Sequence, residues 1–223
     1  MLDKLKRMKE HINQGKHAFS FDPSRFNDPL ANQIQWTSLK SGGSNFRSHN
    51  LVEVNPNRME FRQSLNSKLF SFVFMLAGLL IPVFFIFGSI DLAQEEAWKM
   101  VAFVVVFGLV FIGTGYFSYK RGASPVVFDK MIGKFWKGKD GPDVKPELMN
   151  AEQVKNTADI HALQLISEYV RRDKNSYYSY EINCIMKDTK RYNVMKHGAK
   201  TKIRRDAETL AQFLGKPLWD AAG

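Results

Sequence analysis

Cysteine is nearly absent from this sequence: among its 223 residues, only Cys184 carries a thiol. A lone cysteine excludes an intrachain disulfide and any zinc cluster built from several cysteines, which is typical of a protein from a reducing compartment. Cys184 lies on the apolar side of an alternating stretch, so we interpret it as a small core residue.

Motifs of catalysis and of phosphate binding are also missing. The sequence has neither a Gly-x-Ser-x-Gly elbow nor a Walker loop, and we interpret residues 41–44 as a hairpin turn. The five histidines are scattered, with no pair at the spacing of metal ligands on one helix. His161 and His197 fall at expected strand ends, where they could be neighbours, but we favour two surface imidazoles. We expect no catalytic residue, no cofactor, no metal ligand and no enzyme activity.

Acidic residues are scarcer than basic ones. The chain has 32 Lys and Arg against 22 Asp and Glu, which gives a formal net charge of +10. This balance suits the anionic surface of a cytoplasmic leaflet, and it would also suit nucleic acid. No nucleic-acid recognition motif accompanies the charge, so we favour the membrane and expect no nucleic-acid partner.

Two apolar runs dominate the middle of the chain, at residues 70–90 and 97–117, with the polar segment 91–96 between them. Each run is about twenty residues long without a charge in its middle, and at ~1.5 Å per residue it spans a hydrocarbon core of ~30 Å. Because lipid offers no hydrogen bonds to a backbone, each run is expected to be helical. The alternative is a buried helix pair in a soluble protein. We favour a transmembrane helical hairpin over residues 69–119.

Charges around the hairpin predict its orientation. Its flanks are basic and its connecting loop is acidic: Lys68, Lys120 and Arg121 against Asp91, Glu95 and Glu96. Since positive flanks stay on the cytoplasmic side, both termini are expected there, in a bacterial inner membrane. The first apolar run starts too late for a cleavable signal peptide, so we expect none.

Residues 1–33 are expected to form an N-terminal amphipathic helix and a connector. Apolar side chains recur at near-helical spacing within residues 1–12, among several lysines. Such a helix could lie on the membrane, or it could pack on its own domain or on a partner, and both alternatives stay open. Pro23 and Pro29 mark the polar stretch that follows as irregular.

Short strands are expected on both sides of the hairpin. Residues 34–68 form the first part of a cytoplasmic β domain, with strands at 34–39, 46–54 and 58–63. Residues 120–223 form the second part, with strands at 126–129, 131–136, 160–170, 178–186 and from 192 onward. In the strand at 178–186, Ser179, Glu181 and Asn183 are expected on the polar, outward side. A final helix, capped by Thr201, ends at Gly215 and covers the sheet, and Leu218 and Trp219 fold back onto that sheet.

The expected fold class is an α+β membrane protein. The three strands before the hairpin are too few for a core of their own, so we expect them to join the later strands in one mostly antiparallel sheet of about seven strands. This order of elements, with a closing C-terminal helix, resembles the pleckstrin-homology-like (PH-like) arrangement. The two-helix insertion resembles that of bacterial membrane proteins with such a module and of the photosystem assembly factor Ycf four. The resemblance covers residues 34–214, and it implies an assembly or scaffold role without catalytic residues.

Three function classes follow. The first, which we favour, is a non-catalytic assembly, scaffold or regulatory subunit of a larger membrane complex, with a membrane protein partner or a second copy of itself. The second is a module that responds to anionic membrane lipids, and the third is an accessory subunit of an enzyme or transporter. The residues expected at lipid headgroups are Lys120, Arg121, Lys200, Lys202, Arg204 and Arg205. The residues expected where another helix approaches are Gly78, Gly108, Gly113 and Gly115. The aromatic and β-branched residues around them could instead simply face lipid.

Overall fold

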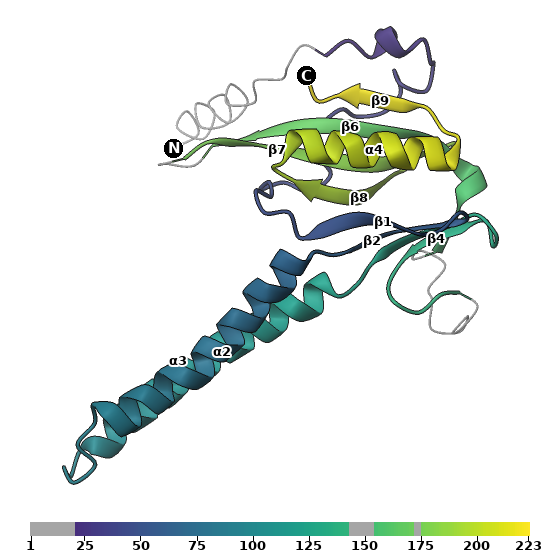
Figure 1. Ribbon diagram of the computed structural model, residues 1–223. Coiled ribbons are helices and arrows are strands. Elements are labelled where there is room, and N and C mark those ends of the chain that lie inside the picture. Colours follow the sequence, from purple (N-terminus) through teal and green to yellow (C-terminus); the bar gives the residue numbers. More distant parts are fainter. Residues whose placement is uncertain (1–20, 143–153, 172–174) are drawn as a thin grey trace, which may run out of the picture. The chain divides into compact units, whose positions relative to one another are not determined.

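The structure, a computed structural model, describes residues 21–142, 154–171 and 175–223 (Figure 1). It is α+β, with antiparallel sheets and two long apolar helices. The amphipathic helix expected within residues 1–12 lies outside the described residues. The chain divides into two compact units. The split unit combines the N-terminal part up to Asn45 with Ile160–Gly223, and the hairpin unit is Phe46–Asp159.

In the hairpin unit, the described residues form an antiparallel sheet in the order β1-β2-β3-β4-β5. Its strands are β1 (His49–Asn55), β2 (Arg58–Gln63), β3 (Val126–Asp129), β4 (Lys134–Lys137) and β5 (Val154–Asn156). Apolar side chains from three of these strands form its core, among them Phe61, Val127, Phe128 and Trp136. Since Phe61 pairs with Val126, the chain leaves β2 and returns to β3 at neighbouring points of one sheet.

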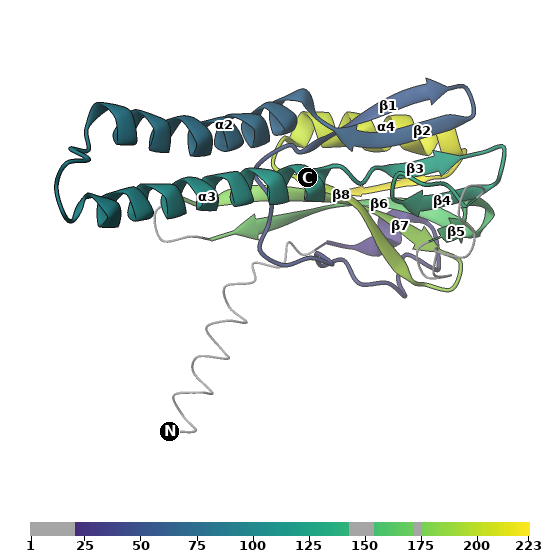
Figure 2. The ribbon, with the colours of Figure 1, turned by 90° about the horizontal axis from the view of Figure 1, so that it is seen from below.

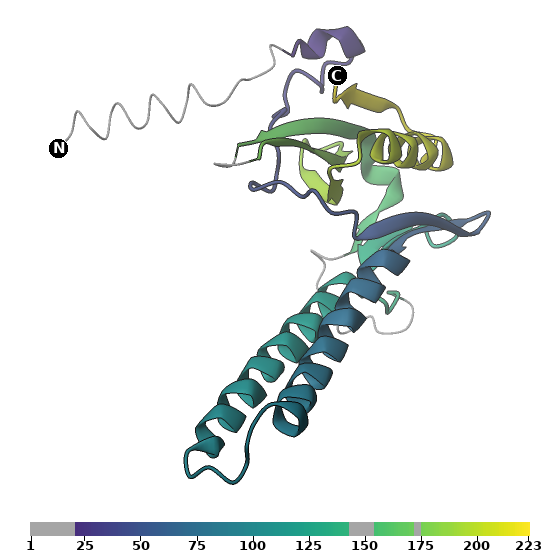
Figure 3. The same cartoon turned by 60° about the vertical axis from the view of Figure 1, so that its left-hand side comes forward.

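The helices α2 (Leu65–Gly88) and α3 (Ala97–Gly122) are inserted between β2 and β3, and they run side by side in opposite directions (Figures 2 and 3). Ser64 caps α2, because its hydroxyl accepts a hydrogen bond from the Ser67 amide at 3.1 Å. Pro82 lies inside α2 without ending it. Both helices are long and apolar enough to cross a membrane, which agrees with the two apolar runs of the sequence.

In the split unit, the described residues form a sheet in the order β8-β7-β6-β9. Its strands are β6 (Ile160–Val170), β7 (Tyr177–Met186), β8 (Arg191–His197) and β9 (Leu218–Ala221), and β9 runs parallel to β6. The helix α4 (Lys200–Leu214) lies along this sheet and contacts all four strands (Figure 1). Its buried stripe includes Ile203 and Leu210, and Gly215, in a left-handed conformation at φ +63°, ends it.

Between Phe21 and Asn45, the split unit has little regular structure. The short 3-10 helix η1 (Pro23–Phe26) is followed by turns, and the strand predicted at 34–39 is wrong, because this segment pairs with no strand of the described residues. Its side chains pack elsewhere: Ile34 is buried in a small cluster with Ala31 and Trp219. Trp36 lies against the same indole, with ring centroids 6.0 Å apart.

Three other expectations are corrected. The strands form two sheets rather than one sheet of about seven strands: β1 to β5 belong to the first sheet, and β6 to β9 belong to the second. Thr201 does not cap α4, which begins one residue earlier with Ala199 at the cap position and no side-chain hydrogen bond there. The strand predicted at 131–136 begins only at Lys134, because a turn at Gly133, with φ +65°, follows Asp129.

Candidate functional site

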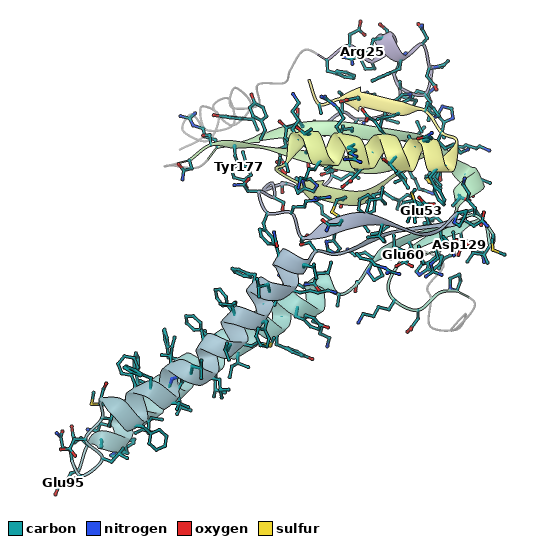
Figure 4. The ribbon with its side chains drawn as sticks, viewed as in Figure 1. Arg25, Glu53, Glu60, Glu95, Asp129 and Tyr177 are labelled. Carbon is teal, nitrogen blue, oxygen red and sulfur yellow. The ribbon has the colours of Figure 1, made fainter. Side chains whose placement is uncertain are left out.

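Large apolar side chains cover the outside of the two long helices (Figure 4). In the most apolar stretches of α2 and α3, only 17% and 11% of the residues are buried. Phe84, Phe87 and Phe103 are 68%, 82% and 70% exposed. A helix pair at the core of a soluble protein would be covered on these faces, whereas a pair in hydrocarbon exposes them to lipid tails.

The inner faces of the hairpin meet through glycines. A Cβ on Gly78 would lie 2.6 Å from the carbonyl oxygen of Gly108, and a Cβ on Gly108 would lie 2.5 Å from Cγ of Pro82. Further along, a Cβ on Gly115 would lie 2.7 Å from the carbonyl oxygen of Ser71. These three glycines therefore let α2 and α3 approach each other closely. The helix that packs against each of them is the other helix of the same hairpin.

Gly113 differs from these three glycines, since a Cβ on it would meet no described atom within 4 Å. It lies in a groove of about 400 Å³ on one face of α3. Small side chains form the middle of the groove, and Arg121 lies at its end, in the last turn of α3. The groove is lined by Val110, Gly113, Thr114, Phe117, Ser118 and Arg121. The hydroxyl of Thr114 donates a hydrogen bond to the carbonyl of Val110 at 2.8 Å, so its hydrogen is already used within α3.

The basic residues expected at lipid headgroups fall into two groups. Lys120 and Arg121 are exposed in the last turn of α3, in the hairpin unit. Lys200, Lys202 and Arg205 are exposed on α4, in the split unit. Arg204 is half-buried instead, because its Nε lies 2.6 Å from Oδ2 of Asp220 and this ion pair ties α4 to β9. Arg204 is thus engaged within the fold.

A compact charge cluster lies on β2. Glu60 is only 4% exposed, and its carboxylate accepts hydrogen bonds from Nε of Arg58 at 2.7 Å and Nε of Arg62 at 2.6 Å. Burial raises the pKa of Glu60, but the hydrogen bonds from Arg62 and Arg58 outweigh it, so the pKa is lowered. Arg58 also lies 3.6 Å from Asp129 on β3, the neighbouring strand. The cluster holds together neighbouring strands of one sheet.

The sequence-based interpretation missed a buried polar face in the split unit. Ser179, Glu181 and Asn183 were expected outside, yet all three are buried. Across the sheet, Asn183 is in register with Gln164 on β6, and its side-chain amide donates to Oε1 of Gln164 at 3.2 Å. Glu181 is in register with Lys196 on β8, and their charged groups lie 3.6 Å apart. The available signal of a buried polar face was the presence of polar residues at paired positions on three adjacent strands.

His197 is not a surface imidazole, which corrects the sequence-based expectation for this residue. His197 is fully buried, and its Nδ1 accepts a hydrogen bond from the Ala199 amide at 3.1 Å. His161 is half-buried, with Nε2 at 2.6 Å from Oδ2 of Asp28. Within residues 21–142, 154–171 and 175–223, no group of three or more His, Cys, Asp and Glu side chains is placed to hold a metal ion.

The hairpin and the polar face are therefore the two features from which function can be argued. In comparisons with known proteins, no family model, no curated protein and no solved structure matches this chain.

Proposed function

We propose that the protein is a non-catalytic integral membrane protein that acts as an assembly, scaffold or regulatory subunit of a larger membrane complex. The observation that carries the proposal is the groove around Gly113 on α3. The hairpin closes on itself through Gly78, Gly108 and Gly115, so the groove is not needed for its own packing. Small residues at such a place allow a second helix to approach closely, and close approach is what stabilises helix pairs in lipid.

The proposed location is a bacterial inner membrane with both termini in the cytoplasm. The support is the length of the two helices, 24 and 26 residues, together with their exposed apolar surface. Lys120 and Arg121 end α3, whereas the loop between the helices carries Glu95 at its tip (Figure 4). This charge asymmetry favours basic ends on the cytoplasmic side.

A PH-like arrangement of the strands is part of the same proposal. Its support is the element order: mostly antiparallel strands, a helix pair inserted between β2 and β3, and α4 near the end of the chain. In such a protein, the sheets and the hairpin both offer surfaces to a partner complex.

The test replaces Gly113 with Leu, which fills the groove and suits hydrocarbon at least as well as glycine. Gly88→Leu is the matched control, because a Cβ on Gly88 has its nearest described neighbour only at 4.0 Å and lies outside the groove. A photo-crosslinking residue at Phe117 reports contacts of the groove, and one at Phe84 reports lipid-facing contacts. We expect Phe117 to give a discrete protein adduct that Gly113→Leu lowers at least threefold and Gly88→Leu leaves unchanged.

Membrane abundance is measured in parallel, so that loss of the protein is not mistaken for loss of the contact. A Phe117 adduct of undiminished yield in Gly113→Leu, at equal abundance, would contradict the role of the groove. A discrete adduct at Phe84 alone would place the contact on another face of the hairpin.

A lipid-responsive module is the second candidate function. The exposed Lys200, Lys202 and Arg205 on one helix favour it. This role predicts that the protein with its hairpin removed binds vesicles containing phosphatidylserine, and that binding falls as salt rises, because exposed charges are screened. Binding that is equal on neutral vesicles would exclude this role. An enzyme activity measured in the purified complex would instead favour an accessory subunit.

A further inference from the structure

Residues 35–44, here called the strap, cross the polar face of the sheet in the split unit. They contact Ser179 and Glu181 on β7, which alternate with Tyr180 and Ile182 and so lie on the opposite face of that strand. Tyr180 lies near Arg204 of α4, so the strap and α4 cover different faces of the sheet. The α4 side is apolar, whereas the strap side carries the polar residues Gln164, Ser179, Glu181 and Asn183 together with Ile166, which is in register with Glu181.

The sheet binds the strap by its main chain. Among the described residues, five side chains of the sheet form hydrogen bonds with backbone groups of the strap. On the carbonyl side, Gln164 donates to Gln35 O at 3.1 Å, Arg191 to Thr37 O at 2.6 Å, and Lys196 to Lys40 O. On the amide side, Leu39 N donates to Glu181 at 2.9 Å, and Ser44 N donates to Ser179 at 2.8 Å.

At the start of the strap, the Trp36 indole packs against Phe26 and Trp219, with ring centroids 5.3 Å and 6.0 Å apart, and anchors that end. Beyond Trp36, side chains of the strap contribute less to this contact. Ser38 donates to Oε2 of Glu181 at 2.5 Å, but Thr37, Leu39 and Lys40 are exposed, with Leu39 at 42%. A contact made through backbone groups tolerates many sequences, because every residue except proline carries the same amide and carbonyl. Recognition of an extended peptide commonly relies on such main-chain hydrogen bonds.

The covered face is also suited to being uncovered. Glu168 and Glu181 both lie near Lys196, at 2.5 Å and 3.6 Å, so the charges stay paired when the strap leaves. Beyond Trp36, water can replace the main-chain hydrogen bonds of the strap, and the apolar contacts of Trp36 with the cluster around Trp219 stay in place. The opposite holds for the face under α4, whose exposure would cost hydrophobic free energy.

We propose that this polar face is a binding site for an extended peptide segment of a partner protein, and that the strap is its intramolecular occupant. A partner segment would take over the backbone hydrogen bonds at Gln164, Glu181, Arg191 and Lys196 while the strap swings away. The strap then acts as a competitor. The apparent association constant of the partner is the intrinsic constant multiplied by the fraction of molecules in which the face is uncovered. This site goes beyond the hairpin contact proposed above.

Gly43 offers a way to release the strap without replacing any of the five binding side chains. A Cβ there would collide with Cγ2 of Val170, and it would lie 3.1 Å from the Tyr177 hydroxyl and 3.3 Å from Cβ of Ser179. Gly42 is a matched control, because it also has a positive φ, +95° against +61°, but a Cβ on it would meet no described atom within 4 Å. Gly43→Leu therefore dislodges the strap, whereas Gly42→Leu adds only backbone strain.

The probe is a fluorescent synthetic peptide with the sequence of residues 34–46, added to the full chain in detergent micelles. We expect Gly43→Leu to bind it at least tenfold more tightly than the unchanged protein and than Gly42→Leu. N-methylation at the Leu39 amide removes the hydrogen that Glu181 accepts, and it should weaken binding at least tenfold. Alanine in place of Thr37 and Leu39 in the peptide should change the affinity by less than threefold.

A second variant replaces the strap by a Gly-Ser linker of equal length and exposes the same face, so the test does not depend on the folding of Gly43→Leu. Failure of the peptide to bind both variants would overturn the proposal. Equal affinity for the N-methylated peptide would also overturn it, because the main chain would then not be what the site recognises. Neither result bears on Gly113, so the proposed role of the hairpin is tested separately.

Discussion

Gly78 and Gly108 face each other between α2 and α3, so closely that a Cβ on Gly78 would lie 2.6 Å from the carbonyl oxygen of Gly108. Real Cβ atoms do not approach a backbone oxygen this closely, and backbone cannot yield as a flexible side chain can. The hairpin therefore depends on the absence of side chains at these two positions. The sequence alone had predicted that another helix approaches at these glycines, without showing that it is the other helix of the hairpin.

The first prediction concerns this contact. Gly108→Leu should separate the two helices and lower the free energy of unfolding by about 1–3 kcal/mol or more, the usual cost of overpacking. Thermal unfolding in detergent measures it. Gly113→Leu is the control, since Gly113 faces open space and should leave the melting temperature within a few degrees of the unchanged protein. Equal melting temperatures for both variants would show that α2 and α3 are not packed through Gly108.

The second prediction concerns Glu60. Its lowered pKa means that it stabilises the fold above its unfolded pKa, near 4.5, and that this contribution is lost as pH falls through the folded value. Glu60→Gln should cost about 1–2 kcal/mol at neutral pH, because it weakens two charged hydrogen bonds, and it should reduce the loss of stability on acidification. Chemical denaturation between pH 7 and pH 3 measures both effects. Glu53→Gln, exposed on β1, should change neither, and a Glu60→Gln variant with unchanged acid sensitivity would refute the assignment.

The third prediction is topological. A cysteine at Gln94 should react with an impermeant maleimide added to whole cells, and a cysteine at Asn175 should react only after the cells are opened. Cys184 should give no background, because it is fully buried and burial raises the pKa of its thiol. Labelling of Asn175→Cys in intact cells would reverse the proposed orientation.

The fourth prediction concerns the two discontinuous parts. Residues 120–223 expressed alone lack β2, which pairs with β3, and the strap, which covers the polar face. We expect an insoluble or molten product. The control joins residues 21–64 to residues 123–223 through a short linker in place of the hairpin, which is feasible because Phe61 and Val126 are paired neighbours. Only the control should give dispersed NMR spectra and cooperative unfolding, so a well-folded 120–223 fragment would contradict the prediction.

Local patterns predicted several elements to the residue. The strands at 58–63, 126–129 and 160–170 were predicted with the bounds that the structure has, since each is a short alternating or apolar run between turn residues. The start of α3 at Ala97 was also predicted, whereas α2 begins five residues before the predicted apolar run and α3 ends five residues after it, because both helices continue into polar turns. The end of α2, at Gly88, lies two residues before the predicted one.

Contacts between distant segments were not predictable in this way. Alternation along β7 placed Glu181 outside, but its carboxylate contacts the strap, more than a hundred residues earlier in the chain. The sequence also identified the helix glycines without showing which of them face the other helix. Which glycines face the other helix depends on how each helix is rotated about its own axis, and sequence spacing does not determine that rotation.

The discontinuity of the split unit has a consequence for translation. Its N-terminal part leaves the ribosome first, but β6, β7 and β8 are made only after the whole of Phe46–Asp159. At roughly 5–20 residues per second, this interval lasts on the order of ten seconds. During it the nascent strap has no sheet to bind, while α2 and α3 are being made. The split unit therefore closes only after the hairpin has been synthesised, and any factor that meets the nascent chain in this interval finds the strap unbound.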